Sequence, residues 1–160
     1  MKPVLAATLL VTSLLGSAAH AEMSAEAARA AVALFYKALN AAFAGDSADL
    51  IRQATAPAWV SCRGNEACNS RDEVIAGVAA RLKSVPDLKW EIKDVLVAGN
   101  EVTVRGEATG TPAGEFFGAP HTGKSFKVMS IDVHTIEGGK MIRSYHIEDW
   151  MGAARQLSAN

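Results

Sequence analysis

The stretch KSFKVMSIDVHTIEGGKMIRSYHIE, residues 124–148, decides the fold class of this chain. It holds two runs, Lys124–Thr135 and Met141–Glu148, that are rich in β-branched residues and alternate locally between apolar and polar. Between them lies Gly138-Gly139, and a pair of glycines between two such runs is typical of a tight hairpin turn. The stretch therefore predicts two neighbouring antiparallel strands.

The segments before this hairpin extend the pattern in two ways. Two more strands are predicted at Leu88–Val97 and Val102–Thr109, with Gly99-Asn100 as the turn between them. The N-terminal part instead has apolar residues at helical spacing. The predicted helices are residues 25–43, capped by Ser24, then Ser47–Gln53 and Arg71–Lys83. Helices followed by antiparallel strands imply an α+β domain in which the helices pack on one face of a curved sheet.

Length and composition exclude several classes of protein. A chain of 160 residues is near the commonest size of one domain, and no internal repeat or low-complexity tract is present. Sixteen basic and seventeen acidic side chains give a net charge of −1 without runs of like charge, so nucleic-acid binding has no electrostatic support. No phosphate-binding glycine loop, nucleophile elbow or His/Cys metal cluster is present in the sequence, which favours chemistry without a cofactor or a metal.

The first 21 residues have the layout of a secretory signal peptide. Lys2 precedes an apolar stretch from Val4 to Leu15, and small residues lead to Ala21, after which cleavage is expected. The apolar stretch is shorter than the roughly 20 residues that a spanning helix needs, so a membrane anchor is the less favoured interpretation. We expect a mature domain of residues 22–160 in the periplasm or secreted, with no membrane segment after cleavage.

The two cysteines, Cys62 and Cys68, flank a short segment that contains Gly64 and Asn65 and suits a tight loop. In an exported chain, two cysteines at this spacing predict one local disulfide. A zinc site would need further ligands nearby, and no histidine occurs within fifty residues downstream. A reactive thiol pair is the remaining alternative.

Three further stretches carry a resemblance to a known family. Residues 110–124, GTPAGEFFGAPHTGK, resemble a glycine-rich segment of SnoaL-like polyketide cyclases and ester cyclases, in the nuclear transport factor 2-like superfamily. Residues 85–92 resemble the start of that family's first long strand, and residues 131–142 resemble its final hairpin. The resemblance implies a cone-shaped, cystatin-like roll whose mostly antiparallel sheet and helices enclose an apolar pocket. It also implies a homodimer formed through the sheet.

The resemblance also indicates where chemistry would take place. The family's catalytic Asp on the last strand corresponds here to His146, which departs from the family pattern. The two assisting positions on the preceding strand correspond to Ser130 and Asp132. We expect His146 to act as a general base that Asp132 orients, since a carboxylate fixes the tautomer of an imidazole and stabilises its charged form. The alternative is that His146 and Asp132 form a polar pair whose role is only structural, to close the cone-shaped fold.

Strand parity adds further candidates for the pocket. His134 has the parity of Asp132, and Glu148 has that of His146. Arg105 is expected either to offer a cation to a ligand or to lie exposed on its strand. His121 is expected to be exposed, and Asp149 is expected to cap a C-terminal helix. Six large aromatic residues are candidates for lining the pocket or filling the core: Tyr36, Trp59, Trp90, Phe116, Phe117 and Trp150.

The sequence leaves three functions open. The first is an enzyme that removes a proton α to a carbonyl and so cyclises or isomerises a small apolar or carbonyl-bearing molecule without a cofactor. The second is a periplasmic binding protein that holds such a molecule without turnover. The third is an interaction role through the sheet dimer, in which side chains fill the pocket. Folds of this kind host all three, so the fold alone does not choose between them.

Overall fold

A computed structural model describes residues 23–159 of the chain. The predicted signal peptide lies outside these residues. The helices are α1 (Ala25–Ala38), the short 3₁₀ helix η1 (Ala41–Phe43), α2 (Ser47–Ala54), α3 (Arg71–Ser84) and α4 (Trp150–Ser158). The strands are β1 (Thr55–Cys62), β2 (Cys68–Ser70), β3 (Lys89–Ala98), β4 (Glu101–Gly110), β5 (Phe126–Glu137) and β6 (Lys140–Glu148).

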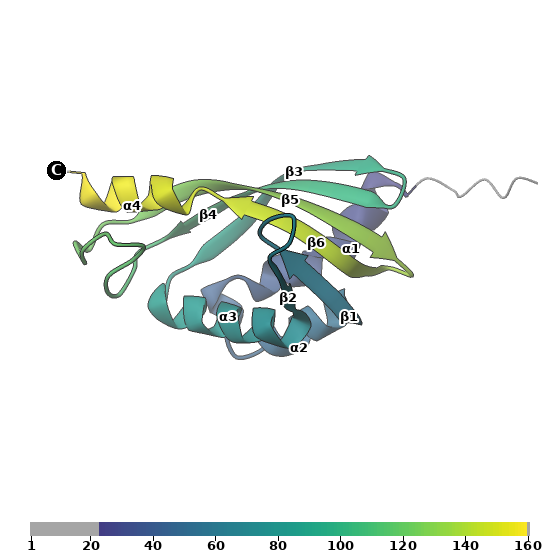
Figure 1. The fold of residues 1–160 in the computed structure, drawn as a ribbon, viewed down its shortest axis with the longest axis horizontal. Coiled ribbons are helices and arrows are strands. Elements are labelled where there is room, and N and C mark those ends of the chain that lie inside the picture. Colours follow the sequence, from purple (N-terminus) through teal and green to yellow (C-terminus); the bar gives the residue numbers. More distant parts are fainter. Residues whose placement is uncertain (1–22, 160) are drawn as a thin grey trace, which may run out of the picture.

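The six strands form one sheet in the order β2-β1-β6-β5-β4-β3. Only the pair β1–β6 is parallel among the described strands, and every other neighbouring pair is antiparallel. Figure 1 shows the sheet curving over α1, α2 and α3, while α4 continues β6 at one end of the molecule. The predicted α+β class, with helices packed on one face of a curved, mostly antiparallel sheet, is confirmed, and the family it resembles has this fold.

Local capping explains where three of the helices begin. Ser24 accepts a hydrogen bond from the backbone of Ala27 at the start of α1. Ser70 and Glu73 form a reciprocal capping box at the start of α3. Asp149 accepts the backbone N–H of Gly152 at 2.7 Å and caps α4, as predicted. Each cap satisfies a backbone donor that the first helical turn leaves free.

The predicted helix over residues 25–43 is in fact two elements, α1 and η1. The break is at Asn40, whose side chain bonds both backbone groups of Trp90 in β3: the N–H of Trp90 donates to Oδ1 at 2.9 Å, and Nδ2 donates to the carbonyl oxygen at 3.3 Å. A tertiary contact of this kind is not visible in helical periodicity. It fixes the end of α1 against β3 and positions the backbone of Trp90.

Two strands, β1 and β2, were not predicted. Buried and exposed residues do not alternate along β1, which contains Pro57, because this strand lies in parallel next to β6 and beneath two helices. Strand β2 has only three residues. The predicted disulfide is present: Cys62 and Cys68 are opposite each other in the β1–β2 pair.

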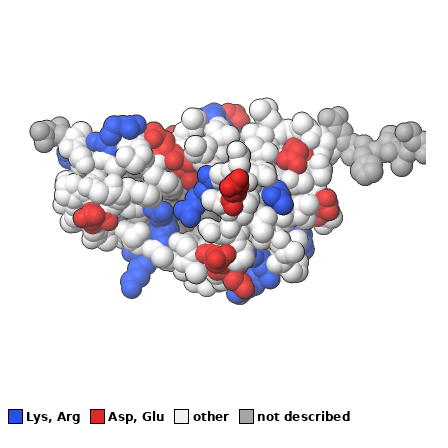
Figure 2. All heavy atoms as spheres, in the orientation of Figure 1, with Lys and Arg blue, Asp and Glu red and all other residues white. Residues whose placement is uncertain are grey.

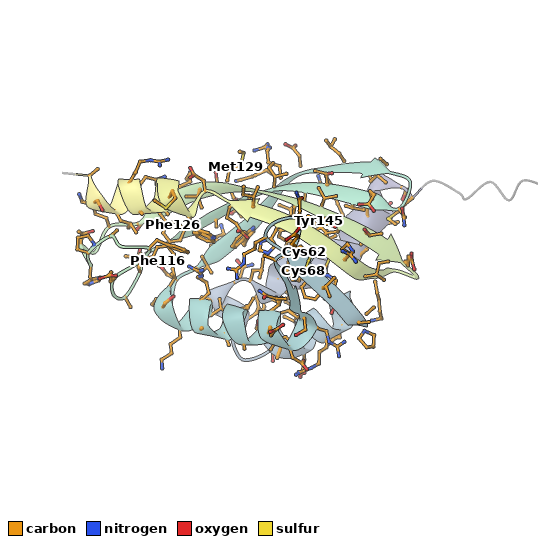
Figure 3. All side chains as sticks on the ribbon, viewed as in Figure 1. Cys62, Cys68, Phe116, Phe126, Met129 and Tyr145 are labelled. Carbon is orange, nitrogen blue, oxygen red and sulfur yellow. A yellow bond between two sulfur atoms is a disulfide. The ribbon has the colours of Figure 1, made fainter. Side chains whose placement is uncertain are left out.

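The core lies between the helices and the inner face of the sheet, and the outer face carries exposed apolar side chains. Figure 3 shows Phe116 and Phe126 beneath α4 at one end of the sheet, whereas Met129 points to the outer side. The exposed apolar residues of the outer face are Leu96, Met129, Tyr145 and Ile147. Among residues 23–159, no helix is long and apolar enough to cross a membrane.

Candidate active site

A pocket of about 200 Å³ lies between the inner face of the sheet and α3. One wall is α3, and the β1–β2 hairpin and the N-terminal helix close the sides. The sheet contributes Trp90, Asp132, His134, Ser144, His146 and Glu148. Helix α3 contributes Glu73, Val74, Gly77, Val78 and Arg81. The third predicted function, which required a filled pocket, therefore loses its structural basis.

The floor of the pocket is built by two neighbouring strands, β5 and β6, whose inward side chains are polar in the middle of the pair. In the β5–β6 register, Asp132 is opposite His146, with the pairs Ser130–Glu148 and His134–Ser144 on either side. Alternate residues of a strand share a face, so these six side chains point to the same side of the sheet. The inner face of a sheet is normally apolar. A cluster of six polar side chains beneath a cavity therefore indicates a binding or catalytic site.

Asp132 is a buried carboxylate in this floor, with 5% of its surface exposed. The hydroxyl of Ser130 donates to its Oδ2 at 2.9 Å, and the hydroxyl of Tyr36 also hydrogen-bonds the carboxylate. Burial, together with the negative charge of Glu148, raises the pKa of Asp132 to about 6 despite these two donors. The carboxylate therefore changes protonation state close to neutral pH.

His146 lies across from Asp132, but its hydrogen bond is to a different carboxylate. Nδ1 of His146 is 2.8 Å from Oε1 of Glu148, two residues along the same strand. The expected orienting contact from Asp132 is thus replaced by one from Glu148, because Ser130 and Tyr36 already hold Asp132. Burial alone would lower the pKa of His146, but the hydrogen bond and charge of Glu148 and the charge of Asp132 outweigh it and raise this pKa.

A directional hydrogen-bond chain ends at Asp132. The indole N–H of Trp59 donates to Ser144 Oγ at 2.9 Å, and this hydroxyl is 2.8 Å from Nδ1 of His134. Burial lowers the pKa of His134 to about 3, so its ring is neutral and carries one N–H. With Ser144 Oγ accepting from Trp59 and donating to Nδ1, the ring proton of His134 is on Nε2 and is donated to the Tyr36 hydroxyl at 3.1 Å. The Tyr36 proton is then left for Asp132.

The mouth of the pocket holds a cation that the sequence analysis did not single out. The guanidinium carbon of Arg81 is 4.6 Å from the ring centre of Trp150, 5.0 Å from that of Phe117 and 5.1 Å from that of Phe116. Burial lowers the pKa of Arg81, the charge of Glu148 raises it, and the charge of Arg63 lowers it further. Arg63, on the β1–β2 hairpin, lines the same pocket.

Most of the predicted pocket residues lie at the pocket or directly behind it. Trp90, Trp150, His134 and Glu148 line it together with the predicted pair, Asp132 and His146. Ser130, Tyr36 and Trp59 do not line the pocket but are buried behind it as hydrogen-bond partners of the lining residues. Phe117 is 47% exposed and stacks on Trp150 at the mouth.

Of the two expectations for Arg105, the exposed position on its strand is the one that the structure shows. Its neighbours Val102 and Val104 are buried on the inner face, whereas Arg105 has the opposite parity and forms an ion pair with Asp94 on the outside. His121 is exposed, as expected, with Nδ1 3.1 Å from the carbonyl oxygen of Pro112. Ser144 is a pocket residue that the sequence analysis missed. It has the same parity as His146, so strand periodicity could have identified it.

Three of the lining residues have donor atoms suited to a divalent cation. One donor atom each from Asp132, His146 and Glu148 can be chosen so that all three lie within 4.8 Å of one another. Two oxygen donors and one imidazole would suit several divalent metals. However, Nδ1 of His146 is already bonded to Glu148, and Ser130 already donates to Asp132, so these groups have partners within the protein.

Comparison with known proteins shows which family and which solved structures this chain resembles. The family model for SnoaL-like polyketide cyclases matches residues 33–157. No curated protein matches the chain significantly. A protein proposed to be a SnoaL-like polyketide cyclase, from Jannaschia sp. CCS1, superposes with a TM-score of 0.71 at 24% identity, over 84% of this chain and 94% of that one.

Two proteins from Streptomyces have similar structures. IdmH from Streptomyces antibioticus, proposed to be a polyketide cyclase, gives a TM-score of 0.71 at 22% identity, over 82% of this chain and 99% of that one. AclR from Streptomyces galilaeus, proposed to be a hydroxylase, gives a TM-score of 0.69 at 21% identity, over 86% of this chain and 84% of that one. At these identities the likeness concerns the fold.

Proposed function

The chain belongs to the SnoaL-like polyketide cyclase family, and we propose that it cyclises or isomerises a small carbonyl compound by general acid/base catalysis without a cofactor. The observation that carries this proposal is the pair Asp132 and His146. The two groups face each other on adjacent strands in a pocket, and the pKa values of both are raised above their ordinary values. A base and an acid with such pKa values are suited to proton transfer at neutral pH.

The displaced pKa values support a division of roles that differs from the sequence expectation. Above pH 6 Asp132 is mostly ionised and can act as the base, while His146, with its raised pKa, retains a proton and can act as the acid. Asp132 takes a proton from the carbon α to a carbonyl. The electron pair of that C–H bond becomes a C=C bond, and the carbonyl oxygen takes the proton of His146.

The resulting enol has two possible fates, and both restore the site. If the substrate is a β,γ-unsaturated carbonyl compound, the γ-carbon takes the proton held by Asp132 while the enol proton returns to His146, which gives the conjugated isomer. Attack on a second carbonyl of the same molecule forms a C–C bond and closes a ring. In the second case the enol proton returns to His146, and the new hydroxyl takes the proton held by Asp132. Glu148 keeps His146 oriented through Nδ1, and Ser130 and Tyr36 hold the carboxylate of Asp132.

The direct test is exchange of α-protons for deuterium in benzylacetone, followed by proton NMR in deuterium oxide. Asp132→Asn and His146→Gln should each slow exchange about 100-fold, because each removes one half of the acid/base pair. Asp94→Asn and His121→Gln are matched controls outside the pocket and should exchange like the wild type. Binding of benzylacetone without exchange in the wild type would instead support the non-catalytic binding protein.

We also propose that the mature protein, residues 22–160, acts outside the cytoplasm, in the periplasm or as a secreted protein. The disulfide between Cys62 and Cys68 supports this location, because such bonds persist in oxidising compartments. N-terminal sequencing of the protein recovered from the cell envelope or the medium should begin at Glu22. A chain that retains Met1 and stays in the cytoplasm would contradict the proposal.

A further inference from the structure

The guanidinium of Arg81 lies at the pocket, and its hydrogen-bond donors are unused. Within residues 23–159 its side chain forms no ion pair and no hydrogen bond. A guanidinium carries five N–H donors, and a half-buried one normally meets a carboxylate or a carbonyl. Here the aromatic rings of Phe116, Phe117 and Trp150 hold it in place, so the donors are left for something that enters the pocket.

The ring of Phe117 reaches Arg81 at a cost in backbone strain. Phe117 has φ +47°, in the left-handed region, and Gly118 follows with φ +80°. The backbones of Phe116 and Ala119 exchange two hydrogen bonds, of 3.0 and 2.9 Å, around this pair, which makes a tight two-residue turn of the type that favours Asn or Gly. A bulky residue is rarely found in this conformation, because its Cβ atom crowds the following carbonyl oxygen. Such strain is typical of segments that form a ligand site.

A second cation lies at the same pocket. Arg63 lines it from the β1–β2 hairpin, which the disulfide closes, and its charge acts on both Arg81 and His146. Figure 2 shows basic side chains gathered beside acidic ones around the hollow between α3 and the sheet. Two like charges that face one cavity repel each other, and an anion between them would relieve this repulsion.

The acidic residues of the lining are already engaged elsewhere. Glu73 completes the capping box with Ser70, and Glu148 bonds His146. Asp132 is held by Ser130 and Tyr36. The arginines are therefore the lining groups whose charges remain free to meet a ligand.

We infer that Arg81, assisted by Arg63, binds a carboxylate of the ligand, so that the substrate class is a small carbonyl-bearing carboxylic acid. This rests on the proposed function for the reacting carbonyl, but the binding of the acid does not require turnover. A planar guanidinium matches the two oxygens of a carboxylate. With the carboxylate at Arg81, the apolar part of the ligand lies against Trp90, Trp150 and Val78, and the enolisable carbon reaches Asp132.

The test compares 3-benzoylpropanoate with its methyl ester, which has the same ring and ketone but no charge. Dissociation constants are measured by isothermal titration calorimetry on the wild type, Arg81→Gln and Arg29→Gln, whose arginine is exposed on α1. The wild type and Arg29→Gln should bind the acid about tenfold more tightly than the ester, as expected for a charge-assisted hydrogen bond. In Arg81→Gln the two compounds should bind almost equally.

The ratio of acid to ester binding distinguishes ligand recognition from a structural role of Arg81. Loss of the aromatic contacts would weaken both compounds alike, and thermal unfolding of Arg81→Gln and Arg81→Lys reports any change in stability. Equal binding of acid and ester by the wild type, an unchanged ratio in Arg81→Gln, or no binding of the acid would each overturn the inference.

The same compounds separate this inference from the proposed function. Asp132→Asn and His146→Gln should keep the preference for the acid while they lose α-proton exchange. A wild type that prefers the acid but exchanges no α-proton would contradict the enzyme and leave the carboxylate site intact. Exchange without any preference for the acid would contradict the carboxylate site alone.

Discussion

At the residue scale, Asp132 combines burial with a charge that the proposed chemistry requires. Its carboxylate lies under the cavity next to Glu148, and only two hydroxyl donors support it. Burying a charge with incomplete compensation destabilises a protein. The fold tolerates this because Ser130 and the chain that ends at Tyr36 fix the carboxylate in one orientation. A side chain that lowers stability and is nevertheless held in one orientation is expected to be a functional residue.

Replacement of Asp132 by Asn should therefore stabilise the protein increasingly as the pH rises. The pKa of Asp132 rises on folding from 3.8 to about 6, so the wild type loses stability as the pH passes through this range, and Asn does not. The difference in free energy of unfolding between Asp132→Asn and the wild type should grow by about 2.5 kcal/mol between about pH 4 and pH 8.

Urea unfolding at both pH values, followed by circular dichroism, measures this difference. His134 also titrates on unfolding, but it is present in both proteins and cancels in the comparison. A difference that stays constant with pH would show that Asp132 is not destabilised by its ionisation.

Residue positions on strands were largely predictable, and residues that meet only through tertiary contacts were not. The family resemblance indicated Asp132 and His146, and strand parity added His134 and Glu148 to the same face. For Arg105 two alternatives were left open, although its parity differs from that of its buried neighbours. Arg81 had no signal at all, because residues far along the chain from it form the aromatic group around it.

At the element scale, the β1–β2 hairpin links stability to the pocket. It carries Ser61, Arg63 and Asn69 of the lining and leads directly into the capping box of α3. The disulfide between Cys62 and Cys68 closes it. The position of one pocket wall thus depends on a short covalent loop.

Removal of this disulfide should lower both stability and acid binding. A loop of this length predicts a loss of about 2 kcal/mol in the free energy of unfolding for Cys62→Ser/Cys68→Ser, because the unfolded chain gains freedom. Binding of 3-benzoylpropanoate should weaken as well, since Arg63 loses its fixed position. Reductant should reproduce both effects in the wild type and change nothing in the double variant; an equally stable double variant would refute this account.

Elements were predictable where their signals are local. The caps at Ser24 and Asp149, the turn at Gly138-Gly139 and the alternation along β3 to β6 are all contained in short stretches of sequence. Strand β1 was missed because its parallel pairing with β6 and its cover of helices remove the alternation on which a strand prediction depends. The end of α1 was missed because a contact with β3 sets it.

At the scale of the whole molecule, the two faces of the sheet differ in chemical character. Its inner face and α3 enclose the polar floor of the pocket, and its outer face exposes Leu96, Met129, Tyr145 and Ile147. The order of helices and strands, with the resemblance of three stretches to one family, was enough to predict this architecture. The pocket opening and its charges depend on how distant segments meet, and no pattern in the sequence predicts them.

The outer face supports the proposal of a homodimer formed through the sheet. Met129 is 53% exposed and Ile147 is 70% exposed, and burial of such residues against a second copy would stabilise the pair. Ile147→Lys should convert the dimer to a monomer in size-exclusion chromatography with light scattering. Met151→Lys, at a residue that is 63% exposed but lies on α4 and not on a strand of the sheet, should remain dimeric. A monomeric wild type would contradict the proposal.

The pH profile of α-proton exchange tests the central claim, an acid/base pair of Asp132 and His146, most directly. The rate for benzylacetone should rise as Asp132 ionises near pH 6 and fall again as His146 loses its proton above its raised pKa. The residual exchange of Asp132→Asn should lack the rise near pH 6, and that of His146→Gln should lack the alkaline fall. A wild-type profile without either limb, or an acid limb that persists in Asp132→Asn, would contradict the account.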